Sequence, residues 1–248
     1  MRSVSTSTRA VSDAVVSVLL SPVCAACRAA LEYPSRGAVC AACWRDIPPL
    51  IPPLCECCGD ALRSWRVSVG ASSHRCVRCR EAPPSITRTR ALGTYDGSLR
   101  AIIHALKYAR RRSLGPQLSG LMQRRCSELL AGADMAVPVP LHLFRRLTRG
   151  FNQAEDLCAA LGLPISHALT RARHTSVQAD LPAISRYANV KDAFQLVKRV
   201  SVHDACIVLV DDVSTTGATL EACAQVLLAG GAREVRALIA ARAVSQSR

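Results

Sequence analysis

Residues 206–220, with the sequence CIVLVDDVSTTGATL, constrain the fold more than any other part of the chain. The stretch opens with five consecutive apolar residues, Cys206 to Val210. Such a run is typical of a strand that is buried on both faces of a parallel sheet. Asp211 and Asp212 follow directly, then a turn rich in hydroxyl groups, then an apolar helical pattern from Leu220. This order predicts an α/β fold in which a strand ends at the acidic pair, where open α/β sheets bind ligands.

The turn after the two aspartates has the chemistry of a phosphate site. Backbone N–H groups at the start of a helix are unpaired and carry partial positive charge, and a glycine lets the main chain approach a ligand closely. Asp211 and Asp212 would repel a phosphate, so they suit sugar hydroxyls or a divalent metal instead. A ligand with a phosphate beside a ribose fits both halves. The alternative is a buried strand followed by an ordinary Ser/Thr helix cap.

A second strand with a polar end lies upstream. Residues 135–141 predict a short strand that is closed by two prolines, and residues 154–161 predict a helix. A turn with arginines and a glycine lies between them, and guanidinium groups match phosphate oxygens in bidentate fashion. The sequence therefore predicts a second anion site, whose candidate residues are Arg146, Arg149, Gly150, Phe151 and Asn152. Lys107 and the three arginines at 110–112 form a cluster of four cations, which is either a solvated face or an anion-contacting loop.

Nine of the 13 cysteines lie in the first third of the chain, and eight of them form four CxxC pairs. This spacing lets two thiolates on one turn reach the same tetrahedral metal. We expect two structural zinc sites with the ligands Cys24, Cys27, Cys40, Cys43, Cys55, Cys58, Cys76 and Cys79. A disulfide scaffold is the alternative, but it needs an oxidising compartment. Spacing alone leaves open whether the sites are sequential or cross-braced, and whether Cys57 is a ligand.

Composition shifts divide the chain into three segments. Residues 1–20 predict a polar tail with a short helix, residues 21–85 a Cys-rich zinc-binding region, and residues 86–248 an α/β domain. The apolar run at 14–20 is short and is a poor match to a secretory signal. No stretch is apolar enough over a sufficient length to span a bilayer, so we expect a cytoplasmic location without membrane contact.

The net charge of +14 comes mainly from arginine. An excess of this size attracts polyanions, either a polyphosphorylated substrate or nucleic acid. Aromatic residues make up only 4% of the chain, which argues mildly against a surface for stacking bases.

Several motifs in a fixed order resemble the ComF family, the amidophosphoribosyltransferase-like competence proteins. They are the paired CxxC motifs, LKY at 106–108, VPVPLH at 137–142, RGFNQA at 149–154, RxRHTxxQ at 171–178, RxxNV at 186–190, AF at 193–194 and VLVDDVSTTGAT at 208–219. The likeness covers about residues 15–242. It departs at Ser185, where the family usually has an acidic residue before the arginine.

The resemblance implies a type I phosphoribosyltransferase-like parallel sheet flanked by helices and preceded by a zinc-ribbon module. In that family, residues matching Asp211 and Asp212 bind the ribose hydroxyls of phosphoribosyl pyrophosphate (PRPP). Those matching the turn bind its 5′-phosphate, here Thr215, Thr216, Gly217, Ala218 and Thr219. A Mg²⁺ ion accompanies PRPP. Lys107 and Arg173 are further candidates for binding the substrate, Arg173 on a segment that forms a mobile loop in similar enzymes.

The function that follows is transfer of a phosphoribosyl group to a nitrogen acceptor, with Asp211, Asp212 and Arg149 as the catalytic candidates. The acceptor and the oligomeric state do not follow from the sequence. The family is linked to DNA uptake in natural transformation. The alternative is therefore a non-catalytic adaptor that binds single-stranded DNA or DNA-uptake machinery, or that senses nucleotides.

Overall fold

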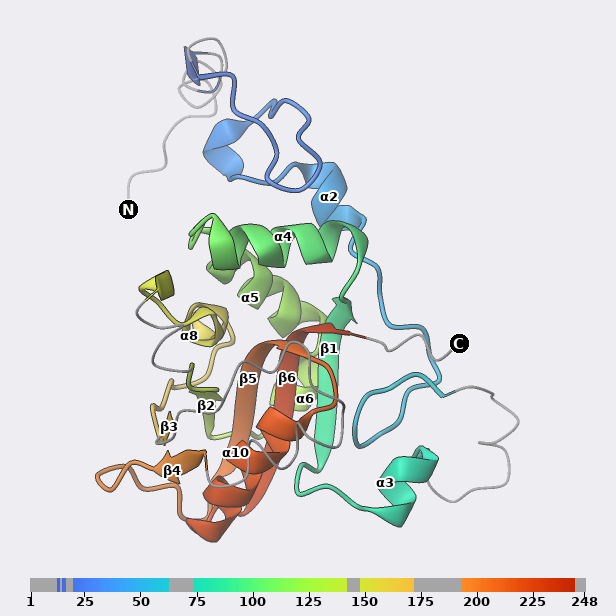
Figure 1. Ribbon diagram of the computed structural model, residues 1–248, viewed down its shortest axis with the longest axis vertical. Helices are drawn as coiled ribbons and strands as arrows, with labels where there is room; N and C mark the ends of the chain where they lie inside the picture. Colours follow the sequence, from blue (N-terminus) through green and yellow to red (C-terminus); the bar gives the residue numbers. More distant parts are fainter. Residues whose placement is uncertain are drawn as a thin grey trace.

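A computed structural model gives the fold of the chain and describes residues 13, 15, 16, 20–62, 74–141, 148–171 and 193–243 (Figure 1). Its centre is a four-stranded sheet in the order β1-β6-β5-β2, and all three strand pairs are parallel. The four strands are β1 (Arg88–Thr94), β2 (Met135–Pro138), β5 (Cys206–Ser214) and β6 (Glu234–Arg242). A separate antiparallel pair joins β3 (Leu169–Arg171) to β4 (Phe194–Leu196).

Helices cover both faces of the sheet, which confirms the predicted α/β class. They are α4 (Gly97–Tyr108), α5 (Leu114–Arg125), α6 (Ser127–Leu130), α8 (Gln153–Cys158) and α10 (Ala218–Ala229). Helices α4, α5 and α8 enclose one buried apolar core, while α10 and the β3–β4 pair enclose the other. In Figure 1, α4 crosses the sheet near the end of β1 instead of running along the strands.

The central strand is longer than the sequence predicted. We expected it to end at Val210, but β5 continues to Ser214 because β6 runs beside it as far as Arg242. Successive side chains of a strand point to opposite faces of the sheet. Val208 and Val210 accordingly belong to the core under α4, and Ile207 and Leu209 to the core under α10. The two aspartates lie inside the strand and not after it.

The other predicted elements are present with shorter bounds. The strand expected at 135–141 is β2, which ends at Pro138, since prolines at 138 and 140 donate no ladder hydrogen bond. The helix expected at 154–161 is α8, which spans only six residues. The short N-terminal helix is helical at its described positions, and the Asp13 carboxylate accepts hydrogen bonds from the N–H and hydroxyl of Ser35 at 2.7 and 2.9 Å.

The eight CxxC cysteines form two clusters of four, in each of which all sulfur atoms lie within 4.8 Å of one another. The clusters follow chain order, Cys24, Cys27, Cys40 and Cys43 in the first and Cys55, Cys58, Cys76 and Cys79 in the second. The sites are therefore sequential and not cross-braced. Cys57 is not a ligand, because its thiol donates to the carbonyl of Ile86 at 3.2 Å.

The sulfur geometry fits zinc. A tetrahedral ion with Zn–S bonds of about 2.3 Å requires sulfur atoms about 3.8 Å apart. The Cys24–Cys43, Cys27–Cys40 and Cys58–Cys76 sulfur pairs are 3.9, 3.8 and 3.7 Å apart. Four thiolates leave no open position for a substrate, so both sites are structural in character.

Backbone N–H groups lower the pKa of one cysteine in each cluster. Burial raises the pKa of Cys24, but hydrogen bonds from the N–H groups of Cys27, Cys40 and Ala26 outweigh it and lower the value to about 6. Burial likewise raises the pKa of Cys55, yet N–H donors at 76, 58 and 57 lower it to about 7. These two cysteines are ready to lose their protons to a metal near neutral pH.

The two cysteine modules lie apart and join the α/β domain differently (Figure 1). The first, residues 21–47 with α2 (Ala41–Arg45), buries Leu31, Val39 and Ile47 in the same core as α4 and α5. The second, residues 53–62 and 74–82 with α3 (Val77–Glu81), has a small core of its own. It is held on β1, where the N–H of Thr89 donates to the Cys57 carbonyl at 2.7 Å. We call them the first and second ribbon.

Within the described part of the chain, none of the helices combines the length and the apolar character that crossing a bilayer would require.

We expect the purified chain to carry two zinc ions, one in each cluster. Cys58→Ser should remove the zinc of the second ribbon, because one of its four ligands is lost, and lower the melting temperature. Elemental analysis and thermal denaturation measure both. The neighbouring Cys57→Ser is the matched control, since serine keeps a donor to Ile86, and it should retain both ions. Metal loss in the control, or retention of both ions in the Cys58 variant, would contradict the assignment.

Candidate functional site

The carboxyl end of β5 continues directly into α10 through a tight turn. Gly217 adopts a φ of 82° at the N-terminal cap of α10, a left-handed conformation that favours glycine. The Thr216 hydroxyl accepts a hydrogen bond from the N–H of Ala218 at 3.4 Å. The strand, turn and twelve-residue helix therefore follow one another as the sequence predicted. Unpaired N–H groups of the first turn of α10 are the donors that such a helix offers to an anion.

The two aspartates of β5 point to opposite faces of the sheet. Asp212 is 8% exposed, and its Oδ1 lies 2.8 Å from Nζ of Lys107, near the end of α4. Asp211 lies on the α10 side, near Cys223. Burial of the Cys223 thiol raises its pKa most, and the negative charge of Asp211 raises it further. Oδ1 of Asp211 also accepts the N–H of Asp212 at 2.8 Å. The structure thus brings two predicted site residues, Lys107 and Asp212, into direct contact.

The arginine-and-glycine turn before α8 lies beside the end of α4. The Arg149 guanidinium stacks 5.1 Å from the centre of the Tyr108 ring, next to Lys107 in the chain. It also donates to Oε1 of the buried Gln153 at 3.3 Å. Gly150 has a φ of 78°, which again favours glycine. Arg149 therefore approaches the same edge of the sheet as Lys107 and Asp212.

Asn152 and Phe151 have structural partners at the start of α8. The Asn152 side chain accepts the N–H of Ala154 at 3.2 Å and donates to the Val139 carbonyl at 3.1 Å. Phe151 is buried, and the Arg112 guanidinium lies 5.2 Å from its ring centre. These contacts fix the turn that carries Arg149 and Gly150.

Two arginines of the 110–112 cluster hold this turn in place. Arg110 donates to the Thr148 carbonyl at 2.7 Å, and Arg112 binds the Asp156 carboxylate through two nitrogens at 3.0 and 2.6 Å. Both arginines are exposed, as a solvated face predicts, and in addition both bind protein groups.

Two predicted substrate contacts, Arg146 and Arg173, lie outside the described residues. Thr215 and Thr219 are at the turn and in the first turn of α10, where the sequence placed them.

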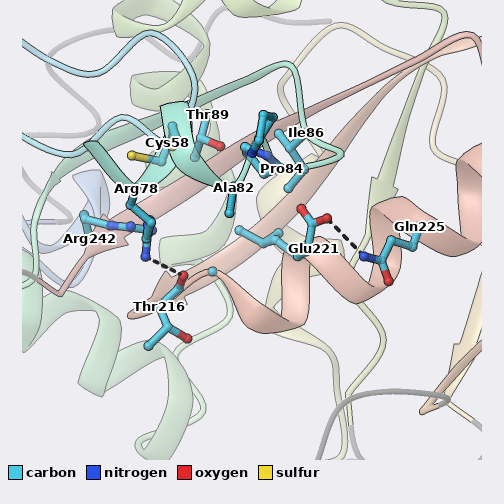
Figure 2. Close-up of a pocket in the computed structure, with 14 residues that line it drawn as sticks. Cys58, Arg78, Ala82, Pro84, Ile86, Thr89, Thr216, Glu221, Gln225 and Arg242 are labelled. Carbon is cyan, nitrogen blue, oxygen red and sulfur yellow. Dashed lines mark hydrogen bonds between the residues drawn. The ribbon is translucent and has the colours of Figure 1, made fainter. Parts of the chain in front are cut away.

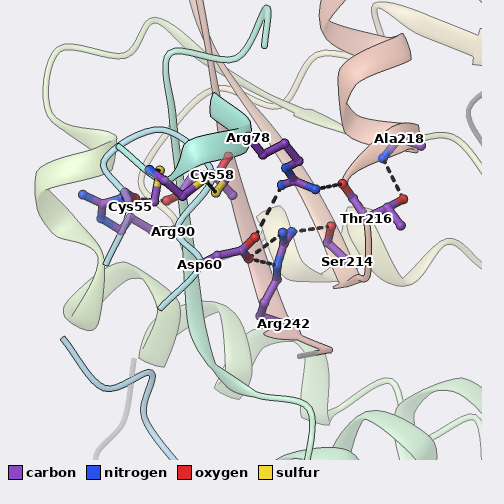
Figure 3. A network of polar contacts seen from close by, with 11 residues as sticks. Cys55, Cys58, Asp60, Arg78, Arg90, Ser214, Thr216, Ala218 and Arg242 are labelled. Carbon is purple, nitrogen blue, oxygen red and sulfur yellow. Dashed lines mark hydrogen bonds and ion pairs between the residues drawn. The ribbon is translucent and has the colours of Figure 1, made fainter. Parts of the chain in front are cut away.

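Three polar residues beside the turn were missed by sequence reasoning (Figure 3). Arg242, at the end of β6, donates to the Ser214 hydroxyl at 3.0 Å and pairs with Asp60 of the second ribbon at 2.6 Å. Arg78 of the same ribbon donates to the Thr216 carbonyl at 3.4 Å. Asp60 and Arg242 are 182 positions apart. The sequence offered one signal for this contact, which is that the charged Arg242 ends the largely apolar strand β6.

A cavity of about 430 Å³ separates the second ribbon from the start of α10 (Figure 2). Pro84, Ile86 and Leu220 form much of its apolar wall, with Glu221 and Arg78 among the polar residues that line it.

One comparison with known proteins matches the N-terminal part of the chain, and others match nearly its whole length. A family model described as "Double zinc ribbon domain" matches residues 15–80. The "DNA utilization protein YhgH" of Salmonella typhi is 34% identical over 224 residues, which cover 86% of this chain and 94% of that protein. The "Competence protein F" of Haemophilus influenzae is 29% identical over 89% of this chain and 96% of its own length.

Among solved structures, the glutamine phosphoribosylpyrophosphate amidotransferase from B. subtilis is 22% identical over 51% of this chain and 26% of its own, with a TM-score of 0.35. A TM-score of that size decides nothing about this chain. Family membership is instead shown by the 34% identity with YhgH, which extends over nearly all of that protein. The chain belongs to the ComF family, together with the DNA utilization protein YhgH and competence protein F.

Proposed function

We propose that this chain is a phosphoribosyltransferase-like protein that binds PRPP together with Mg²⁺ and transfers the phosphoribosyl group to a nitrogen acceptor. One observation carries the proposal. Asp211 and Asp212 lie in the last part of the central parallel strand, which ends at Ser214, and a left-handed Gly217 at the end of the following turn begins a twelve-residue helix. This places carboxylates for a sugar next to N–H donors for a phosphate.

The 5′-phosphate would lie on the turn between Ser214 and α10. N–H groups of the first helical turn and the hydroxyls of Thr215, Thr216 and Thr219 are its donors, and the helix dipole favours its charge. Gly217 leaves this approach open because it has no side chain.

The ribose would lie at the edge of the sheet that carries the two carboxylates, one on each face. Asp211 and Asp212 offer oxygens to its hydroxyls, and they are also the ligand type that Mg²⁺ prefers. The ion that accompanies PRPP supplies charge neutralisation at the pyrophosphate when bound. Lys107 fixes the orientation of Asp212 through their 2.8 Å contact and adds a cation to a site for an anionic substrate.

The pyrophosphate would depart toward Arg149 and the Gly150–Asn152 turn. The bond from the anomeric carbon to the pyrophosphate oxygen breaks, and its electron pair leaves with that oxygen. The lone pair of the acceptor nitrogen forms the new bond to carbon, and the nitrogen then loses a proton. Catalysis consists mainly of positioning and of stabilising the leaving group. Arg146 and Arg173 remain predicted contributors.

We expect the double variant Asp211→Asn, Asp212→Asn to lose saturable binding of PRPP in the presence of Mg²⁺, because the amides remove both negative charges. Isothermal titration calorimetry measures the affinity, and circular dichroism with zinc analysis reports whether the fold is intact. Asp204→Asn is the matched control, since it weakens an arginine contact at the opposite end of β5. Unchanged affinity in a folded double variant would refute the role of the aspartates.

A second candidate function, binding of single-stranded nucleic acid, is favoured by two grooves beside the first ribbon. One groove, of about 990 Å³, lies against α5, and its lining includes Arg36, Arg45, Arg124 and Arg125 with Tyr33 and Trp44. The other, of about 570 Å³, lies against α4, and its lining includes Arg28, Arg100 and Arg111 with Tyr108. Glu32 is the only acidic residue in either described lining. Arginines with interspersed aromatic rings suit a phosphate backbone and stacked bases.

To test it, Arg36, Arg45, Arg124 and Arg125 are replaced together by Gln, and binding of an oligothymidylate is followed by fluorescence anisotropy over a range of salt. Each lost phosphate contact lowers the slope of log affinity against log salt by about 0.7. We therefore expect a shallower slope, by about three, and weaker binding. The control replaces Arg88, Lys198, Arg199 and Arg233, which removes the same charge elsewhere. Equal effects of both sets would show attraction by net charge alone and exclude the groove.

A further inference from the structure

Charged side chains connect the second ribbon to the turn between β5 and α10 (Figure 3). The Asp60 carboxylate, on the ribbon, binds both Arg242 and Arg78, at 2.6 and 3.4 Å. Each arginine then reaches a different group of the turn, the Ser214 hydroxyl at 3.0 Å and the Thr216 carbonyl at 3.4 Å. One carboxylate of the ribbon thus orients two guanidinium groups toward the turn.

Arg242 occupies the space beneath the turn. It is 4% exposed, and one of its terminal nitrogens lies 4.0 Å from the position that a Cβ would take at Gly217. Burial of a guanidinium without a charged partner is strongly unfavourable, so Asp60 is required to keep it there. The Ser214 hydroxyl, itself buried, is in turn held at the last residue of β5.

Arg78 sets the direction of a peptide group. In a planar trans peptide, the carbonyl of one residue and the N–H of the next point in opposite directions. Because the Thr216 carbonyl is drawn toward the ribbon, the N–H of Gly217 faces away from it. That N–H is one of the donors that the proposed phosphate would require.

A third contact holds the start of α10. Glu221, in the first turn of this helix, accepts the N–H of Ser85 through both carboxylate oxygens, at 3.0 and 3.1 Å. Ser85 lies in the segment that links the second ribbon to β1. The ribbon therefore contacts the strand end and the turn, and the segment that follows it contacts the helix start.

We propose that Asp60, Arg78 and Arg242 are positioning residues that hold the turn in its phosphate-binding conformation, so that the second ribbon is a part of the substrate site. The proposal rests on the proposed function, because it concerns the 5′-phosphate end of that site. It assigns the two ribbons different roles, since the network contains no residue of the first ribbon.

The test compares Asp60→Ala, Arg78→Gln and Asp60→Asn with wild type and with Asp204→Asn as control. Arg242 is left unchanged at first, because its burial makes a substitution there liable to unfold the chain. Two readouts are taken. Hydrogen exchange by mass spectrometry follows the amides of residues 214–221 without ligand, and calorimetry follows the binding of ribose 5-phosphate and, separately, of Mg²⁺ with pyrophosphate.

We expect faster exchange at 214–221 in the Asp60→Ala and Arg78→Gln variants, and an affinity for ribose 5-phosphate that is lower by about tenfold. Affinity for pyrophosphate should stay near wild type, which a general loss of structure would not permit. Asp60→Asn, which keeps one acceptor oxygen, should fall between wild type and Asp60→Ala. The control should match wild type in both readouts.

The outcomes separate this inference from the proposed function. Unchanged exchange at 214–221 in all three variants overturns the positioning role, whatever the binding data. Faster exchange with unchanged affinity for ribose 5-phosphate overturns it as well. If wild type binds neither ribose 5-phosphate nor PRPP, the proposed function fails, while the exchange data still decide whether the ribbon holds the turn.

Discussion

Parallel pairing of β5 with both β2 and β6 is the constraint on which the rest of the structure depends. A strand in this position is buried on both faces, so its side chains are apolar until it reaches the edge of the sheet. Parallel pairing also brings the carboxyl ends of all four strands to that edge. Because α4 crosses there, Lys107 reaches Asp212, and the turn before α8 reaches the end of α4 through Tyr108.

The two ribbons solve the same problem of stability in different ways. Each is too small for its own apolar contacts to hold it folded, and metal binding by four thiolates supplies the missing free energy. The first ribbon also shares the main core, with Ile47 packed among residues of α4 and α5. The second relies on backbone contacts with β1 and on the ion pairs of Asp60. Gly59 permits this close contact, since a Cβ there would lie 2.7 Å from the Thr89 carbonyl oxygen.

Local patterns in the sequence predicted the elements that depend on local chemistry. The apolar run of β5, the glycine at the start of α10 and the presence of two four-cysteine zinc sites all follow from short-range rules, whereas the grouping of the CxxC pairs came from the fold. The directions of Asp211 and Asp212 did not, because they depend on how far β6 extends beside β5. Short-range rules could not predict the Asp60–Arg242 pair, because only the folded sheet brings these two residues together. Arg110 and Arg112 could not be assigned from charge alone either, because their partners lie about forty positions away.

Charge at the site is balanced before any ligand arrives. Lys107 pairs with Asp212, and Asp60 offsets one of the two arginines beside the turn. Arg78 and Arg242 lie beside the carboxylates of Asp60 and Glu221 at one end, and Arg149, stacked on Tyr108, lies at the other. The proposed substrate, with a phosphate at one end and a pyrophosphate at the other, would lie between these two groups of arginines. The arginine grooves beside the first ribbon are a separate positive surface. The proposed phosphorylated substrate and a polyanion would therefore bind at different places on the chain.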